Sequence, residues 1–285
     1  DRLTAAARPA RRWRLRVPRP AAVGLLAGTA AVAAAVAITM AQVVAPEGGG
    51  SATAAAAEVL RDAAATARSG PPVRPGPYSY TRELVVHPGA NERGCKETWL
   101  RRDGSIAASL ILAERSGGRC DLKAPGRWLP ALGPGHDDRR PHADVRALPT
   151  GPSALRARLY SDAARGRGQN PDSTGPRDQL VFDRIGHLLR MAIPPELRAA
   201  LFETLATIPG VDVVRGEKDA LGRQGIALAR SFGDAANPVR LEIILAPGTY
   251  RYLGTKAVQD MGDGPQTDLT ALLTTAVVNS PAQRP

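Results

Sequence analysis

Aromatic residues and familiar catalytic motifs are both scarce in this chain. Only 3 Trp, 5 Tyr and 3 Phe occur among 285 residues, and much of the apolar content is alanine. The sequence contains no Gly-x-Ser-x-Gly nucleophile elbow, no Ser-x-x-Lys acylation motif and no glycine-rich phosphate loop. These absences exclude the enzyme classes that depend on such motifs. We therefore predict that the chain is not an enzyme and that it uses no cofactor.

Cysteine is equally rare, and Cys95 and Cys120 are the only two. A zinc site would need more ligands at close spacing, and neither cysteine belongs to a CxxC pair or has a histidine nearby. Outside the cytoplasm two such thiols would be oxidised, so we predict one disulfide between them. Closing this loop would stabilise the fold by about 3–4 kcal/mol in the chain-entropy model.

Charge is absent from one long segment. Residues Ala21 to Val44 form a run of 24 uncharged residues, mostly Ala, Val, Leu and Ile. As a helix the run would be about 36 Å long, which exceeds the roughly 30 Å hydrocarbon core of a bilayer. We predict a transmembrane helix here. Two alternatives stay open, namely a buried alanine-rich core helix and a cleaved signal peptide that ends at Val43-Val44-Ala45.

Basic residues are concentrated on one flank of this run. Residues 1–19 carry seven arginines and one aspartate, a net charge of +6 out of the +11 of the whole chain. Arginine on one side predicts an N-terminus in the cytoplasm and a remainder outside it, in a single-pass protein of the cell membrane. The partner of these arginines is then the lipid bilayer, whose anionic lipids attract them. A nucleic-acid-binding arm is the alternative, which we do not favour, so no nucleic acid partner is expected.

The sequence beyond the apolar run predicts an α+β fold. Residues 78–87 alternate with strand period, and Asp103-Gly104 between two apolar-bearing runs is a hairpin signal. Apolar residues within 180–189 and 195–208 fall on one helical face, and strand patterns return over 211–258. This order of strands, helices and strands predicts an extracytoplasmic curved antiparallel sheet whose one face is covered by helices.

Composition shifts divide the chain into five parts. We predict a basic cytoplasmic segment over 1–20 and the transmembrane helix over 21–45. An exit linker with a helix follows over 46–77, and the extracytoplasmic α+β domain occupies 78–260. Residues 261–285 are expected to be a C-terminal tail.

Histidine, which could bind a metal ion, is also scarce, and the chain has four. His136 and His142 share a loop with aspartates over 136–144, where a divalent metal would find nitrogen and carboxylate ligands. A metal site there would make the chain a membrane-anchored envelope hydrolase, which is the alternative function. A solvated polar loop is the simpler interpretation, so we predict no metal. His187 is expected to be partly buried in a helix, and His87 to be exposed at a strand end.

Four of the five tyrosines are arranged in two pairs. Tyr78 with Tyr80 and Tyr250 with Tyr252 have i, i+2 spacing, which places both rings of a pair on one face of a sheet. If the two strands are neighbours, the four rings form a patch that would line an apolar or amphipathic ligand groove. The alternative is that they fill ordinary core positions.

Six short segments, all of them turns, helix starts or joints between elements, carry a likeness to a known family: Pro75–Tyr80, Leu148–Thr150, Pro194–Leu201, Ile208–Val211, Asp219–Arg223 and Gly225–Ala227. They resemble actinobacterial single-pass membrane proteins of uncharacterised function that are often encoded beside extracytoplasmic-function sigma factors. The order of elements also resembles the half-barrel of lipoprotein carriers (LolA-like proteins).

The resemblance implies a sensor-like or anti-sigma role and names no catalytic residue. The chain departs from conventional anti-sigma factors, because it has no His/Cys zinc-binding signature and only a short basic segment before the apolar run. We therefore expect a membrane-anchored extracytoplasmic binding or sensor protein whose ligand is a lipid, a peptide or an envelope protein. Regulation of a sigma factor is what the resemblance adds to this expectation.

Overall fold

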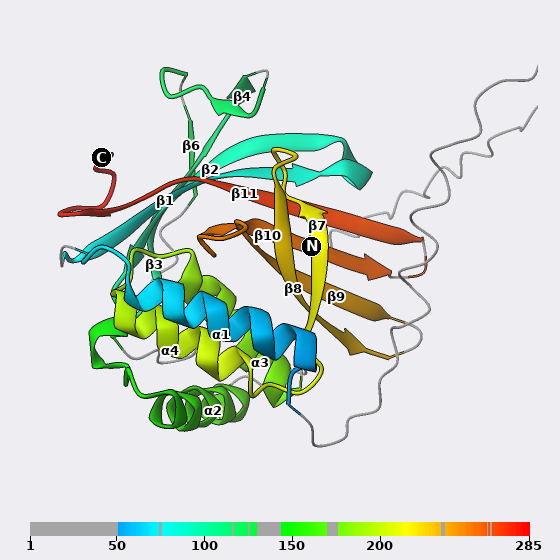
Figure 1. Cartoon of the computed structure of the whole chain (residues 1–285). Helices are drawn as coiled ribbons and strands as arrows, with labels where there is room; N and C mark the ends of the chain where they lie inside the picture. The colour runs from blue at the N-terminus through cyan, green and yellow to red at the C-terminus, as the bar shows by residue number, and fades with distance from the viewer. Residues whose placement is uncertain are drawn as a thin grey trace, which may run out of the picture. The chain divides into compact units, whose positions relative to one another are not determined.

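A nine-stranded antiparallel sheet organises the described part of the chain (Figure 1). The computed structural model describes residues 51–73, 76–115, 117–124, 126–129, 144–169, 176–234, 237–260, 262 and 264–285. The strands follow the order β6-β3-β2-β1-β11-β10-β9-β8-β7, and β4 pairs separately with β5. The predicted α+β class with an antiparallel sheet is confirmed. The elements are α1 (Ala54–Arg68), β1 (Tyr78–His87), η2 (Pro88–Ala90), β2 (Glu92–Arg101), β3 (Ile106–Leu112), β4 (Glu114–Arg115), β5 (Arg119–Cys120), β6 (Arg127–Leu129), η3 (Val145–Ala147), α2 (Pro152–Gln169), α3 (Arg177–Leu189), α4 (Pro195–Leu205), β7 (Asp212–Lys218), β8 (Gln224–Gly233), β9 (Pro238–Leu245), β10 (Tyr252–Asp260) and β11 (Pro265–Val278).

The predicted basic segment 1–20 and transmembrane helix 21–45 lie outside the described residues. Within the described ranges, none of the helices combines the length and the apolar character that crossing a bilayer requires. Both parts of the membrane hypothesis therefore stay predictions.

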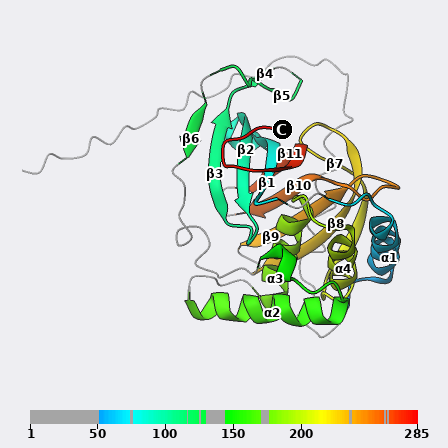
Figure 2. The same cartoon turned by 90° about the vertical axis from the view of Figure 1, so that its left-hand side faces the viewer.

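The two faces of the sheet bury different cores. Neighbouring residues of a strand point to opposite faces, so Leu100 packs against the helices whereas Trp99 does not. The same division separates Ile243 from Ile244 and Tyr252 from Leu253. We call the face that packs against the helices the helix side and the opposite face the outer side. The helices gather on the helix side, as two views at right angles show (Figures 1 and 2).

Irregular pairing accompanies the curvature of the sheet. The strand register shifts by one residue at four places, including Arg82/Glu83 on β1 and Tyr252/Gly254 on β10. An extra residue in one strand of a pair bends that strand and increases its twist. The sheet accordingly curves strongly around the helices (Figure 2).

The helix α1 belongs to the folded domain, not to a linker that precedes it. Thr53 caps it, because its Oγ1 accepts a hydrogen bond from the Ala56 amide at 3.2 Å and donates one to Asp212 Oδ1 at 3.0 Å. Leu60 of α1 is fully buried in the same core as α4. The predicted boundary at residue 78 therefore separates residues that share one core.

The predicted disulfide is present between Cys95 of β2 and Cys120 of β5, with the two Cα atoms 5.6 Å apart. It ties the small β4–β5 ribbon to the outer side of the sheet.

The predicted hairpin is confirmed as well. Gly104 adopts a φ of 82° in the β2–β3 turn, a conformation that a residue with a Cβ would adopt only with strain.

The predicted tail 261–285 is wrong for most of its length, because Pro265–Val278 forms β11. This strand pairs with β1 on one side and β10 on the other. It joins two antiparallel meanders, one made of β1, β2, β3 and β6 and the other of β7 to β10. Its partners on β1 are some 180 to 200 positions away in the sequence, so no local sequence pattern predicts the pairing.

We expect a fragment 46–260, which lacks β11, to lose cooperative folding, because β1 and β10 would become unpaired strand edges. Circular dichroism and thermal unfolding would show this loss against the fragment 46–285. A fragment 46–278, which keeps β11 and lacks only the residues after it, is the matched control and should melt cooperatively. Cooperative melting of 46–260 would contradict the central place of β11.

Candidate functional site

A groove lies between α3 and the helix side of the sheet. Its volume is about 1270 Å³, and residues of α3 and of eight strands line it. The volume exceeds the roughly 300–1,000 Å³ of typical small-molecule pockets. Most of the lining residues on the sheet belong to β1, β2, β9 and β10.

The floor of the groove is a strip of partly exposed apolar side chains. Phe232 of β8 pairs with Val239 of β9, and Leu241 of β9 pairs with Ala257 of β10. Val85 of β1 and Ile111 of β3 extend the strip across the sheet. Each lies on the helix side, yet no helix covers it fully, and so the strip leaves apolar surface for another molecule to bury.

One face of α3 forms the opposing wall. Asp183, Gly186, His187 and Arg190 line the groove, and their i, i+3, i+4 and i+7 spacing puts them on one helical face. Gly186 lets the helix approach the sheet, since a Cβ there would lie 3.2 Å from Ile243 Cδ1. The wall is therefore polar where the floor is apolar.

A buried carboxylate lies at the inner end of the groove. Glu83 of β1 is only 4% exposed, and Arg190 Nη1 lies 3.4 Å from its Oε2. Lys96 of β2 is the cross-strand neighbour of Glu83 and also lines the groove. Burial, together with the nearby negative charge of Glu83, raises the pKa of the Tyr252 hydroxyl and keeps that group protonated.

The groove thus combines apolar area with fixed charges of both signs. Such a surface binds an amphipathic molecule, whose apolar part covers the strip while its polar part meets the ion pair. Among the residues that the structure describes, no group of three or more His, Cys, Asp or Glu is placed to hold a metal ion.

The predicted metal-binding histidines His136 and His142 lie outside the described residues. Of the predicted loop only Asp144 is described, and it caps η3 by accepting a hydrogen bond from the Arg146 amide at 2.9 Å. The hydrolase alternative stays an untested prediction.

The four predicted tyrosines do not form one patch. Strand β11 lies between β1, which carries Tyr78 and Tyr80, and β10, which begins at Tyr252. Tyr80 packs against Trp99 on the outer side, with ring centroids 5.3 Å apart, whereas Tyr252 faces the groove. Tyr250 lies in the turn before β10 with a φ of 49°. The prediction required neighbouring strands, and that requirement fails.

Of the four predicted tyrosines only Tyr252 lines the groove, and the other lining residues were not predicted as a site. His187 is exposed on the groove wall, so the expectation of partial burial is wrong. His87 lies at its rim, partly exposed, with Nδ1 2.6 Å from Asp268 Oδ1. One sequence signal points to the groove: Glu83 is a charged residue at a helix-side position of a largely apolar strand.

No family model, no curated protein and no solved structure matches this chain. Function is therefore inferred from the residues of the groove itself.

Buried tyrosines make the stability of the domain sensitive to alkaline pH. Burial and a hydrogen bond to Glu97 raise the pKa of Tyr80 to about 12, and burial also raises the pKa of Tyr160 to about 12. In the unfolded chain a tyrosine ionises near pH 10. The contribution of Tyr80 to stability is therefore fully present below pH 10 and is lost as the pH rises through about 12.

The unfolding free energy of the wild type should fall between pH 10 and 12. We predict that this fall is about 2–3 kcal/mol smaller in the variant Tyr80→Phe, since each pKa unit corresponds to about 1.4 kcal/mol. Urea unfolding at several pH values would measure it. The variant should keep the decline that Tyr160 and Tyr252 cause. An unchanged decline in Tyr80→Phe would contradict the assignment.

Proposed function

We propose that this chain is a membrane-anchored extracytoplasmic binding or sensor protein whose groove takes an amphipathic ligand. The observation that carries the proposal is the apolar strip beside the buried Glu83–Arg190 pair. Lipids and peptides with apolar side chains are the ligand classes that fit this combination.

The energetics support a ligand with an extended apolar part. Burying one methylene contributes about 0.8 kcal/mol, so roughly ten methylenes supply on the order of 8 kcal/mol before ordering costs. The costs of association and ordering are subtracted from this gross energy, so the net binding free energy is smaller. The ion pair then selects among ligands, because a polar group placed beside it must satisfy both charges.

The compartment is part of the same proposal. The disulfide between Cys95 and Cys120 fits an oxidising environment. The apolar run 21–44 and the arginines before it support an anchor with the N-terminus in the cytoplasm. A sensor so placed would report ligand occupancy across the membrane, and the resemblance found in the sequence suggests a sigma-factor system as its recipient.

Groove binding can be tested with a fluorescent fatty acid titrated into the fragment 46–285. Leu241→Arg places a charge in the apolar strip and should weaken the Kd at least tenfold. Val258→Arg is the matched control, because Val258 is a partly exposed strand residue that follows Ala257 and lies outside the groove lining. Equal affinity in the wild type and Leu241→Arg, or an equal loss in Val258→Arg, would contradict the groove as the binding site.

The proposed topology predicts that protease added to intact cells digests the part of the chain after residue 46. An epitope at each end would report the outcome on a gel, with permeabilised cells as the control for protease activity. Protection of the larger part in intact cells would overturn both the orientation and the compartment.

A further inference from the structure

The outer side of the sheet, which faces away from the groove, holds a buried carboxylate of a different kind. Glu97 of β2 is fully buried. Its Oε1 accepts a short hydrogen bond from the Tyr80 hydroxyl and lies 3.5 Å from Arg82 Nε. A buried carboxylate is costly unless hydrogen bonds and positive charge compensate it, and these two partners alone leave one oxygen open.

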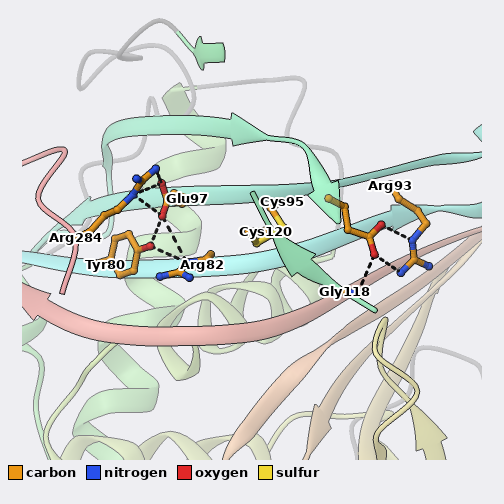
Figure 3. Close-up of a disulfide and its surroundings, with 9 residues drawn as sticks. Tyr80, Arg82, Arg93, Cys95, Glu97, Gly118, Cys120 and Arg284 are labelled. Carbon is orange, nitrogen blue, oxygen red and sulfur yellow. Dashed lines mark hydrogen bonds and ion pairs between the residues drawn. A yellow bond between two sulfur atoms is a disulfide. The ribbon is translucent and has the colours of Figure 1, made fainter. Parts of the chain in front are cut away.

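The missing partner comes from the exposed segment Asn279–Pro285, which follows β11 (Figure 3). Arg284 lies alongside Glu97 as a fork: its Nε is 3.0 Å from both carboxylate oxygens, and its Nη2 is 2.7 Å from Oε2. Its Nη1 also donates to the Leu122 carbonyl at 3.2 Å. Three nitrogens of one guanidinium thus meet acceptors.

The backbone before Arg284 is held in place as well. The indole Nε1 of Trp99 donates to the Gln283 carbonyl at 2.5 Å. The Gln283 side chain accepts hydrogen bonds from the amides of Asn279 at 2.8 Å and Ser280 at 3.3 Å, which folds the segment into a turn. The segment presents one arginine to the pocket and leaves its other side chains exposed.

The pocket fits a guanidinium better than an ammonium. Its acceptors are a planar carboxylate and a backbone carbonyl, which match the fixed donors of arginine, whereas lysine offers a single point charge. Aromatic rings border it: Trp99 lies 5.3 Å from Tyr80 and 5.6 Å from Trp128, and Trp128 is 52% exposed. An exposed tryptophan beside the pocket offers further surface to a bound peptide.

We propose that the Glu97 pocket is a recognition site for an arginine side chain of a peptide, and that Arg284 occupies it in cis as a built-in competitor. A tethered segment has an effective concentration near the millimolar range, so a free peptide gains the pocket only when the segment is released or outcompeted. Because the pocket and the groove lie on opposite faces of the sheet, this site does not depend on the groove's ligand.

The test uses the full chain in detergent and a heptapeptide with the sequence Asn279–Pro285. The variant Arg284→Ala vacates the pocket and should bind this peptide at least tenfold more tightly than the wild type does, as measured by calorimetry. The same peptide with lysine in place of arginine should bind at least tenfold more weakly. Adding Glu97→Gln to Arg284→Ala should abolish binding.

Arg93→Ala is the matched control, because Arg93 also forms a two-pronged pair on β2, with Glu114 at 2.7 and 3.0 Å (Figure 3). It should gain no affinity for the peptide. If Arg284→Ala fails to fold, Arg284→Lys keeps a charge near Glu97 and should still bind the peptide more tightly than the wild type. If a folded variant at Arg284 binds no peptide up to millimolar concentration, the segment has only a structural role and the proposal is overturned.

Discussion

The pairing of β1 with β11 is the constraint on which the rest of this structure depends. It joins two meanders that are each continuous in the sequence into one sheet, with partners running from Tyr78–Val278 to Val86–Leu269. Without it, β1 and β11 would be edges with unsatisfied backbone groups. Loop-closure entropy opposes contacts between such distant segments, yet it grows only slowly with loop length, so paired backbone groups and burial on both faces can offset it.

The two faces of the sheet carry different buried charges. The register shift at Arg82/Glu83 adds one residue to β11 opposite β1, at the point where Arg82 faces the outer side and Glu83 the groove. Side chains alternate between the two faces along β1, and Glu97 pairs with Arg82, so the buried carboxylates of Glu83 and Glu97 have separate surroundings. Glu83 meets Arg190 of α3, and Glu97 meets Arg82 and Arg284. A buried charge needs a partner, and each face supplies its own.

Local features of the domain were predictable from the sequence. The Asp103-Gly104 turn, the strand period of 78–87 and the pairing of two solitary cysteines each depend on residues read in their immediate context. The site was less predictable. Tyr252 lines the groove, but the four-tyrosine patch does not form, because it required β1 and β10 to be neighbours.

The sequence alone determined the kinds of element over 78–112 and 180–258, the Asp103-Gly104 turn, the disulfide and the α+β class, because period, glycine and cysteine act locally. It also shows the uncharged run and its arginines, from which the membrane hypothesis follows. Only the tertiary structure decided that 265–278 is a central strand and that Glu83 and Arg190 meet in a groove. Backbone hydrogen bonds between strands are nearly the same for any side chains, so strand order is decided by which faces can be buried together.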